Sequence, residues 1–567
     1  MCGILFNLSA CSSTPSQAHV TLVSHRGPDA TRTHAITAHG KTLTLTSSLL
    51  SVRGSEPTLQ PLVDASTGSV LCWNGEAWRV HGHPLAEGAN DTLEIFKVLL
   101  NAPEGRIQDV IGAIEGEFAF VFWDGHGGVW FGRDWAGRRS LVVRRREGEM
   151  ELASVGDGEG GWEEIEAGGL GRIDVESGEE TWITRRSTGE EIYGIPSMNL
   201  SQPTLEELAP LSVDSLEVSG LHDALLESLR LRVRDVQLPP NADLHSRHVP
   251  ANAQEDVRVA VLFSGGVDCT VIARIAHEVL PPDEPIDLLN VAFENPRIVA
   301  ARSAPPPALN LKKKKAAVPR PLNGVIPPAP TTTAELDPYA LCPDRATGLS
   351  SYHELCKTCP TRRWRFISIN IPYTEVLEHR KTVIDLMYPH NTEMDLSIAL
   401  AFYFAARGRG AFGSSGSQDY TTPARILLSG LGADELLGGY SRHSTAFRRA
   451  GYQGLLDELD LDFQRLGKRN LGRDDRVAAH WAKEMRYPFL DEKVVSWAMA
   501  TPVVGKCPFG EPENGVENGK KVLRLLAKKL GMEKAAGEAK RAVQFGARTA
   551  KMSVESRKMK GTDGLMA

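Results

Sequence analysis

The chain has 567 residues, which is too long for one hydrophobic core, so we expect two to four domains. Its 41% hydrophobic and 24% charged residues are typical of a globular protein. The formal net charge of -7 gives no support to a nucleic-acid or membrane-surface partner. No apolar stretch reaches the roughly 18 residues that span a bilayer.

The start of the chain and its cysteines favour a cytoplasmic location. Met-Cys-Gly-Ile-Leu-Phe has no basic region and no long apolar run before a cleavage site, so we expect no secretory signal. The eight cysteines are scattered over the whole length, which suits a reducing compartment better than a disulfide framework. The sequence gives no indication of an oligomeric state.

Residues 1–195 are expected to form a mostly β domain. Short apolar runs separated by Gly-rich turns predict strands over 42–50, 70–73, 118–123, 129–132 and 140–143. One helix is expected after Asn90-Asp91, where Leu93, Phe96 and Leu100 recur at helical spacing. The proline-containing residues 196–215 are predicted to be a linker.

Residues 216–555 change to an α/β pattern. The apolar run 257–263 predicts a strand buried on both faces, and a helix with an apolar face follows it. Further strands are expected over 288–293 and 425–428, and a core helix over 394–404. Alternating strands and helices predict a parallel, doubly wound sheet.

Two segments interrupt this order. Residues 237–256 are polar and contain proline, and residues 295–345 are rich in proline, so both are predicted to be disordered insertions. The second insertion carries Lys312-Lys313-Lys314-Lys315, which could be a nuclear-import patch, although a solvated loop is the better interpretation.

Cys2 directly follows the initiator methionine. Removal of Met1 would place its thiol beside a free α-amine, whose reference pKa near 7.7–8.0 suits a base that serves its own side chain. N-terminal nucleophile hydrolases work in this way. Because cysteine follows methionine in many proteins, the position alone is weak support for catalysis.

Two further segments could complete such a site. The amide of Asn74 and the N–H of Gly75 end an apolar strand, and both can donate to a developing oxyanion. Glu76 and Asp91 supply two carboxylates that could bind the α-ammonium of a substrate. The alternatives are a hairpin turn at Asn74-Gly75 and a helix N-cap at Asp91.

Ser264-Gly265-Gly266-Val267-Asp268 stands between a buried strand and a helix. Its glycines let the backbone approach a phosphate, and its N–H groups and the following helix add positive potential. Asp268 could hold Mg²⁺ against phosphate oxygens. The segment is not a Walker A motif, because no Gly-Lys-Ser/Thr follows it.

A second glycine-rich segment runs from Ser429 to Glu435 and also follows an apolar strand. Its Asp434 could join Asp268 at one metal ion and one pyrophosphate. The alternative is that Asp434 only caps a helix. The pair of loops favours the metal and pyrophosphate interpretation.

The motifs of the first domain resemble class II glutamine amidotransferases, most of all the glutaminase domain of asparagine synthetase. They are Cys-Gly-Ile, His25-Arg26-Gly27-Pro28-Asp29, Gln60-Pro61-Leu62, Trp-Asn-Gly-Glu, Asn-Asp-Thr and Phe131-Gly132-Arg133-Asp134. The resemblance implies an Ntn-hydrolase-like αββα sandwich in which Cys2 attacks glutamine. Asn74 and Gly75 would form the oxyanion hole, and Glu76 with Asp91 would hold the amino-acid end.

The second domain resembles the synthetase half of the same enzymes through Ser-Gly-Gly-x-Asp, Gly-Ala-Asp-Glu-Leu-x-Gly-Gly-Tyr and Arg486-Tyr487-Pro488-Phe489-Leu490-Asp491. The implied fold is an ATP-pyrophosphatase domain with a doubly wound parallel sheet, which uses ATP with Mg²⁺. The residues implied to bind the nucleotide are Phe263, Ser264, Gly265, Gly266, Asp268, Val291, Ser429, Gly430 and Asp434. Asp268 and Asp434 would hold the metal.

Three positions depart from the pattern of asparagine synthetase. Ser48 stands where the family has an arginine for the glutamine carboxylate, although Arg53 could reach in from another register. Leu431 replaces the carboxylate that would assist ammonia attack, and Ala542 replaces a lysine that stabilises the acyl-adenylate and pyrophosphate. These losses resemble the divergent asparagine synthetase domain-containing proteins of eukaryotes.

Three cysteines in the second domain, Cys342, Cys356 and Cys359, could suggest zinc with His353 as a fourth ligand. The spacing does not repeat as in a paired ribbon, so ordinary thiols are the better interpretation.

Three functions remain open from the sequence. The first is a glutamine-dependent ligase that amidates aspartate through an acyl-adenylate. The second is a related ligase that acts on another small carboxylate. The third is a non-synthesising regulatory protein that binds glutamine or ATP. Leu431 and Ala542 favour the second and third functions, whereas Cys2, Asn74 and Asp268 argue against complete loss of chemistry.

Overall fold

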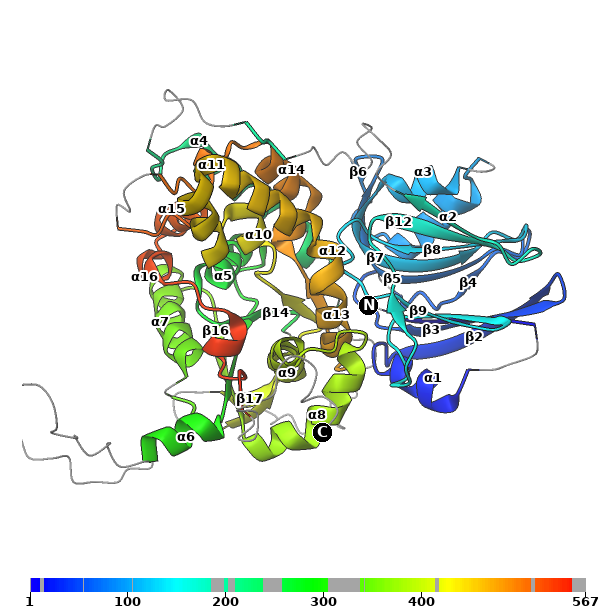
Figure 1. Ribbon diagram of the computed structural model, residues 1–567, viewed down its shortest axis with the longest axis horizontal. Helices are drawn as coiled ribbons and strands as arrows, with labels where there is room; N and C mark the ends of the chain where they lie inside the picture. The colour runs from blue at the N-terminus through cyan, green and yellow to red at the C-terminus, as the bar shows by residue number, and fades with distance from the viewer. Residues whose placement is uncertain are drawn as a thin grey trace, which may run out of the picture.

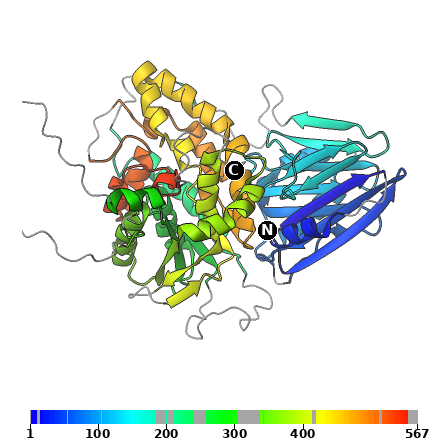
Figure 2. The ribbon, with the colours of Figure 1, turned by 60° about the horizontal axis from the view of Figure 1, so that its bottom comes forward.

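The computed structural model describes residues 2–10, 15–54, 56–103, 106–184, 198–201, 210–237, 257–303, 337–340, 342–412, 418–510 and 515–552. They form a strand-rich β lobe (residues 2–184), drawn in blue and cyan, and a helix-rich α/β lobe (residues 210–552), drawn in green to red (Figure 1). The chain starts where the two lobes meet, as both views show (Figures 1 and 2). No helix of these ranges is long and apolar enough to cross a membrane.

The β lobe contains two antiparallel sheets, with strand orders β11-β9-β10-β1-β3-β2 and β13-β12-β8-β7-β5-β4, and β6 pairs with β5. Its strands are β1 (Cys2–Ser9), β2 (Ala30–Ala38), β3 (Lys41–Leu49), β4 (Leu62–Val63), β5 (Val70–Val80), β6 (His83–Pro84), β7 (Ile114–Trp123), β8 (Gly128–Arg133), β9 (Val142–Arg146), β10 (Glu149–Ala153), β11 (Glu163–Glu164), β12 (Gly169–Asp174) and β13 (Glu180–Thr184).

The two sheets stack face to face around an apolar core. Phe6 of β1 and Leu45 of β3 meet Val121 of β7 and Phe131 of β8 in this core, and all four side chains are fully buried. Helix α1 (Gln17–Ser24) contacts β1 and β3, whereas α2 (Asp91–Leu100) contacts β5 and α3 (Ile107–Gly112). The lobe therefore has the αββα layering that the family resemblance implies.

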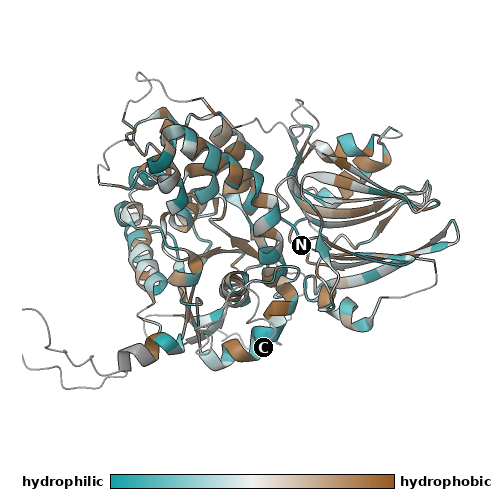
Figure 3. Cartoon of the chain, in the orientation of Figure 1, coloured by the Kyte–Doolittle hydropathy of each residue, from teal (hydrophilic) through white to brown (hydrophobic). Residues whose placement is uncertain are grey.

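The α/β lobe is built on one sheet of order β18-β17-β16-β15-β14-β19-β20. Its strands are β14 (Val259–Leu262), β15 (Ile286–Phe293), β16 (Trp364–Ile371), β17 (Arg409–Phe412), β18 (Gln418–Thr421), β19 (Ile426–Leu428) and β20 (Glu484–Arg486). Strands β14, β15, β16, β19 and β20 are parallel to one another. Strand β17 runs antiparallel to β16, and β18 runs antiparallel to β17. The strands are mostly apolar, and many helices show both hydrophilic and hydrophobic residues (Figure 3).

Helices surround this sheet. They are α4 (Leu216–Val233), α5 (Val267–Val279), α6 (Pro296–Ser303), α7 (Pro343–Thr358), α8 (Tyr373–Met387), α9 (Glu393–Arg407), α10 (Ala433–Leu437), α11 (Ser441–Gln464), α12 (Leu466–Arg469), α13 (Leu471–Ala479), α14 (Glu492–Ala500), α15 (Lys521–Lys529), α16 (Glu533–Gly537) and α17 (Val543–Gly546), with 3-10 turns η1 (Pro488–Leu490) and η2 (Val503–Gly505).

The strand order reverses between β14 and β19. From β14 the chain moves outward to β15 and β16, whereas β19 and β20 lie on the opposite side. Loops that leave neighbouring strands on opposite sides of such a switch point diverge and open a crevice at the carboxyl ends, where ligands of open α/β sheets bind. Both predicted glycine-rich segments leave the sheet at this point.

Several elements differ from the sequence-based expectations. Helix α1 was not predicted, and the predicted core helix extends over α9, whose Met394 is exposed. The predicted insertion at 295–345 is wrong at its edges, because α6 occupies Pro296–Ser303 and α7 begins at Pro343. Most of both insertions, including the lysine run at 312–315, lies outside the described residues, as does half of the predicted linker.

Candidate active site

Cys2 and Asn74 lie side by side in the β lobe although 72 positions separate them. The backbone nitrogen of Cys2 donates to Oδ1 of Asn74 at 3.0 Å, and the amide of Gln60 approaches Sγ of Cys2 at 3.4 Å. With Oδ1 used in this way, the buried Nδ2 of Asn74 has no acceptor among the described residues. Asn74 thus offers a free amide N–H beside the thiol, as an oxyanion requires.

Gly75 lies inside β5, not in a hairpin turn. Strand β5 continues to Val80 and pairs with β7, with Gly75 opposite Phe118. Its φ of +133° is a conformation that side-chain-bearing residues rarely adopt, and a Cβ there would meet the carbonyl oxygen of Glu117. The hairpin alternative is therefore wrong, and the glycine is needed for close packing of the two strands.

Glu76 and Asp91 are both buried next to this cysteine site. Asp91 Oδ2 accepts from the backbone N–H of Ala77 at 2.8 Å, whereas the N-cap of α2 is Asn90, so the N-cap alternative for Asp91 is wrong. Burial and the Asp91 charge raise the pKa of Glu76 to about 8, and burial raises the pKa of Asp91.

The departure at Ser48 has a structural explanation. Ser48 is fully buried in β3, where its hydroxyl accepts from the N–H of Gly3 and donates to the carbonyl of Val23. Arg53, five residues later, does reach the site: Nη1 lies 3.6 Å from Glu76 Oε2, and its buried Nε has no acceptor in the part of the chain that the structure describes. A guanidinium is thus present, displaced along the chain.

The thiol of Cys2 needs help to ionise. Burial raises its pKa to about 11, so the protonated thiol dominates near neutral pH. Nucleophilic attack from this position requires a nearby base to accept the thiol proton.

The α/β lobe holds a cavity of about 730 Å³ at the switch point. Eight of the nine residues predicted to bind ATP line it, namely Phe263, Ser264, Gly266, Asp268, Val291, Ser429, Gly430 and Asp434. The cavity extends past this set to α9, α12 and α13. It has the dimensions of a small-molecule site with room for a second substrate.

Gly265 lies in the same loop but is not part of the cavity wall. Its φ is +83°, and a Cβ would come within 2.4 Å of the backbone at Thr347 and Gly348 in α7. Thr347 and Ser351 donate their hydroxyl protons to the carbonyls of Ser264 and Gly265 at 2.9 and 2.7 Å. Helix α7 thereby fixes the loop through two of the loop's carbonyl groups.

Asp268 and Asp434 face one another across the cavity. The ammonium of Lys520 lies 2.7 Å from Asp268 Oδ1 and 2.8 Å from Asp434 Oδ1, and Lys540 contacts the second oxygen of Asp434. Burial opposes ionisation, but the two lysines hold the pKa of Asp434 well below its usual range. Oxygens of both carboxylates come within reach of one cation, which fits a Mg²⁺ site.

Neither lysine was predicted from the sequence. Lys520 precedes α15 with a left-handed φ of +56°, so no helical or strand pattern marks it. Lys540 lies two positions before Ala542 in a non-helical segment, and Leu431, Lys540 and Ala542 all line the cavity. Alternate residues of an extended segment share a side, so Lys540 places a cation on the side where Ala542 lacks one.

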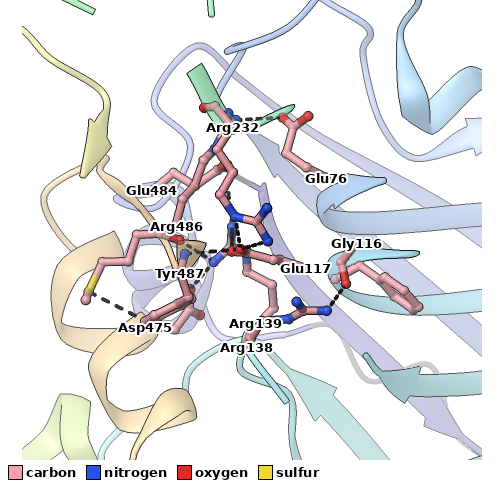
Figure 4. Close-up of polar contacts among 12 residues, drawn as sticks. Glu76, Gly116, Glu117, Arg138, Arg139, Arg232, Asp475, Glu484, Arg486 and Tyr487 are labelled. Carbon is pink, nitrogen blue, oxygen red and sulfur yellow. Dashed lines mark hydrogen bonds and ion pairs between the residues drawn. The ribbon is translucent and has the colours of Figure 1, made fainter. Parts of the chain in front are cut away.

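Buried arginines and carboxylates join the two lobes (Figure 4). Five of these side chains are fully or almost fully buried, and we call them the interlobe charge cluster: Glu117, Arg139, Arg232, Glu484 and Arg486. Glu117 accepts from Arg232 Nε at 3.0 Å and lies 3.2 Å from Arg139 Nη2, and Arg486 Nε donates to Glu484 at 2.6 Å. These contacts place the β lobe rigidly against the carboxyl end of β20.

Cys342, Cys356 and Cys359 do not gather as metal ligands, because no group of three or more potential ligands that could hold a metal ion occurs among the described residues. Cys342 is buried and donates to the carbonyl of Gly546 at 2.8 Å, and Cys359 caps α7.

Comparison with known families agrees with this division. Residues 1–158 match the glutamine amidotransferase domain family, and residues 449–560 match the asparagine synthase family. The protein is therefore of the class that joins a glutamine amidotransferase domain to a synthetase-like domain.

Proteins similar to almost the whole chain identify the family within this class. Asparagine synthetase domain-containing protein 1 of Mus musculus is 31% identical, over 98% of this chain and 97% of its own. The Homo sapiens protein of that name is 31% identical over 97% and 95%, and a Saccharomyces cerevisiae asparagine synthetase domain-containing protein is 32% identical over 99% and 94%. The chain belongs to the family of asparagine synthetase domain-containing proteins.

Proposed function

We propose that the protein hydrolyses glutamine at Cys2 and uses the ammonia to amidate a carboxylate that its ATP site activates as an adenylate. The observation that carries this proposal is the free Nδ2 of Asn74 beside Cys2 in a chain whose Asp268 and Asp434 converge on one cation position. Both half-sites are thus equipped for chemistry.

The glutamine half-reaction begins with the α-amine that removal of Met1 exposes. This amine takes the thiol proton, Cys2 Sγ attacks the amide carbon, and the carbonyl oxygen becomes an oxyanion held by Asn74 Nδ2 and the N–H of Gly75. The amine then gives the proton to the departing nitrogen, and ammonia leaves a thioester. Water hydrolyses the thioester to glutamate and the free thiol.

Three buried charged side chains bind the α-ammonium and α-carboxylate groups of glutamine. The carboxylates of Glu76 and Asp91 take the α-ammonium of glutamine. Arg53 takes the α-carboxylate, since its Nε lacks an acceptor among the described residues and its Nη1 lies 3.6 Å from Glu76. Arg53 would thereby replace the arginine that Ser48 does not provide.

The ATP half-reaction joins the acceptor carboxylate to the α-phosphorus of ATP and releases pyrophosphate; ammonia then attacks the acyl carbon and AMP leaves. Mg²⁺ held by Asp268 and Asp434 would screen the phosphate charge. Lys520 and Lys540 direct two ammonium groups at the same region, where the leaving pyrophosphate gains charge.

The acceptor is aspartate or another small carboxylate. Leu431 lines the cavity where a carboxylate would assist ammonia attack, and Met394, Ile398 and Phe402 add apolar surface from α9. This wall favours an acceptor with an apolar part over aspartate, whose second carboxylate would lose hydration there.

The test measures glutamate release from glutamine, and pyrophosphate release from ATP with and without aspartate, on the purified chain and on Cys2→Ala. Glutamate release that Cys2→Ala abolishes supports the glutaminase half. Pyrophosphate release that depends on aspartate identifies the acceptor, and a panel of apolar carboxylates tests the alternative. No turnover, with glutamine and ATP still bound, would contradict the proposal and support a non-synthesising regulatory protein.

A further inference from the structure

Glu76 belongs to the β lobe but lies at its boundary with the α/β lobe. Its Oε1 is 3.3 Å from Nη2 of Arg486, and its Oε2 is 3.6 Å from Nη1 of Arg53. Both Glu76 and Arg486 are about 2% exposed. A residue of the second lobe thus contacts directly the carboxylate that we assign to glutamine recognition.

Arg486 is held firmly in this position. Nε donates to Glu484 at 2.6 Å, Nη1 donates to the backbone carbonyl of Arg232, and the guanidinium lies 5.1 Å from the ring of Trp78. Strand β20 aligns its backbone, whose carbonyl accepts from the N–H of Ser429 at 2.9 Å. A guanidinium fixed on every side is a charge in a defined place, not a mobile surface group.

We propose that Arg486 is a positioning residue of the glutamine site, which orients Glu76 and favours its charged form for the α-ammonium of glutamine. This inference rests on the proposed glutaminase function and adds that the α/β lobe completes its substrate site.

The charges that face Glu76 come from three elements. Asp91 at the start of α2 and Glu484 of β20 are carboxylates that disfavour its ionisation, whereas Arg53 after β3 and Arg486 of β20 favour it. Burial raises the pKa of Glu76 to about 8 even with both arginines present. Loss of Arg486 therefore raises this pKa further and lowers the ionised fraction of Glu76 near neutral pH, and a neutral carboxyl binds an ammonium poorly.

The experiment measures glutamine binding by calorimetry between pH 6 and pH 8.5, with the full chain carrying Cys2→Ala so that no turnover occurs. The affinity of this parent should rise with pH and begin to flatten only near pH 8, where half of Glu76 is ionised. With Arg486→Met added, we expect affinity about tenfold lower at pH 7.5, which corresponds to one pKa unit, and a rise that continues to the end of the range.

A second variant should lower the pKa of Glu76, whereas Arg486→Met should raise it. Glu484→Gln removes a carboxylate that opposes ionisation of Glu76 and leaves Arg486 free to pair with it, so the binding curve should move to lower pH. If the substitutions only loosened the contact between the lobes, both variants would bind glutamine more weakly. The proposal instead requires their binding curves to move along the pH axis in opposite directions. If Arg486→Met does not fold, Glu484→Gln decides alone.

Arg425→Met is the matched control. Arg425 also crosses from the α/β lobe, where it precedes β19, and its Nη2 donates to Asp29 at 2.8 Å without contacting Glu76. Its binding curve should equal that of the parent. A folded Arg486→Met protein with the parent's curve, or no shift in Glu484→Gln, would overturn the inference. A wild-type chain that neither binds nor hydrolyses glutamine would instead refute the proposed function.

Discussion

Replacement of Lys520 by methionine should destabilise the α/β lobe and make its stability depend on magnesium. The Lys520 ammonium is the cation that both Asp268 and Asp434 contact, at 2.7 and 2.8 Å, and its side chain is 3% exposed. Without it, the buried carboxylate of Asp434 and the half-buried carboxylate of Asp268 face each other with Lys540 as a partial counterion. Mg²⁺ can enter between them and restore the balance.

The magnitude follows from the geometry. A contact at this distance is worth about 6 kcal/mol at an effective dielectric constant of roughly 20. The desolvation of the ammonium offsets much of this, and removal of one partner from a buried pair costs about 3–5 kcal/mol. With an unfolding entropy of about 2.1 cal/mol/K per residue, a cooperative unit of roughly 300 residues would melt about 5–8 °C lower.

The assay is thermal unfolding without nucleotide, in EDTA and in a magnesium series. Magnesium at roughly 100 times its Kd should return about 2.7 kcal/mol to the Lys520→Met protein and much less to wild type. Lys506→Met is the control, because that buried lysine donates to the backbone carbonyl of Ala498 at 2.5 Å. An unchanged melting temperature in Lys520→Met, or an equal magnesium response in wild type, would refute the reasoning.

Three further substitutions test other parts of the two sites. Asn74→Ala should lower kcat for glutamate release by about 10²–10³ with a small effect on KM, and a kcat within threefold of wild type would exclude its oxyanion role. Lys540→Ala should lower ATP–pyrophosphate exchange by about 10², and Ala542→Lys in that background should recover part of it; absence of recovery would argue against a shared face. Gly265→Ala should weaken ATP binding at least tenfold by fluorescence titration, whereas Gly148→Ala, with similar positive φ but open space around it, should bind normally.

Local patterns predicted the elements that carry strong periodicity. The apolar run that forms β14, the glycines after it and the apolar face of α5 gave the loop and its surroundings correctly. Helix α1 escaped prediction because only His19 and Val23 of its residues are buried, too few for a recognisable stripe. The edges of the second insertion failed because proline content suggested disorder, although proline also begins helices such as α7.

Site residues that belong to one local sequence motif could be predicted, whereas contacts between distant segments could not. The sequence alone allowed either a turn or a strand at Asn74-Gly75, and the structure shows a strand, because both residues pair with β7. The contacts of Lys520 with Asp268 and of Arg486 with Glu76 could not be predicted from local patterns, because they join residues 252 and 410 positions apart in the chain. The motif that contains Arg486 indicated the family but not this contact. Such charges are placed by the tertiary fold.

The position of β20 at the end of its sheet has a consequence for how this protein can be divided. An outermost strand leaves backbone groups unpaired, and here Arg139 of the β lobe donates to the carbonyl of Met485 at 2.7 Å. Separating the two lobes would expose the edge strand β20 and leave several buried charged side chains without their partners. Both changes favour aggregation. Separate expression of the halves should therefore yield insoluble material.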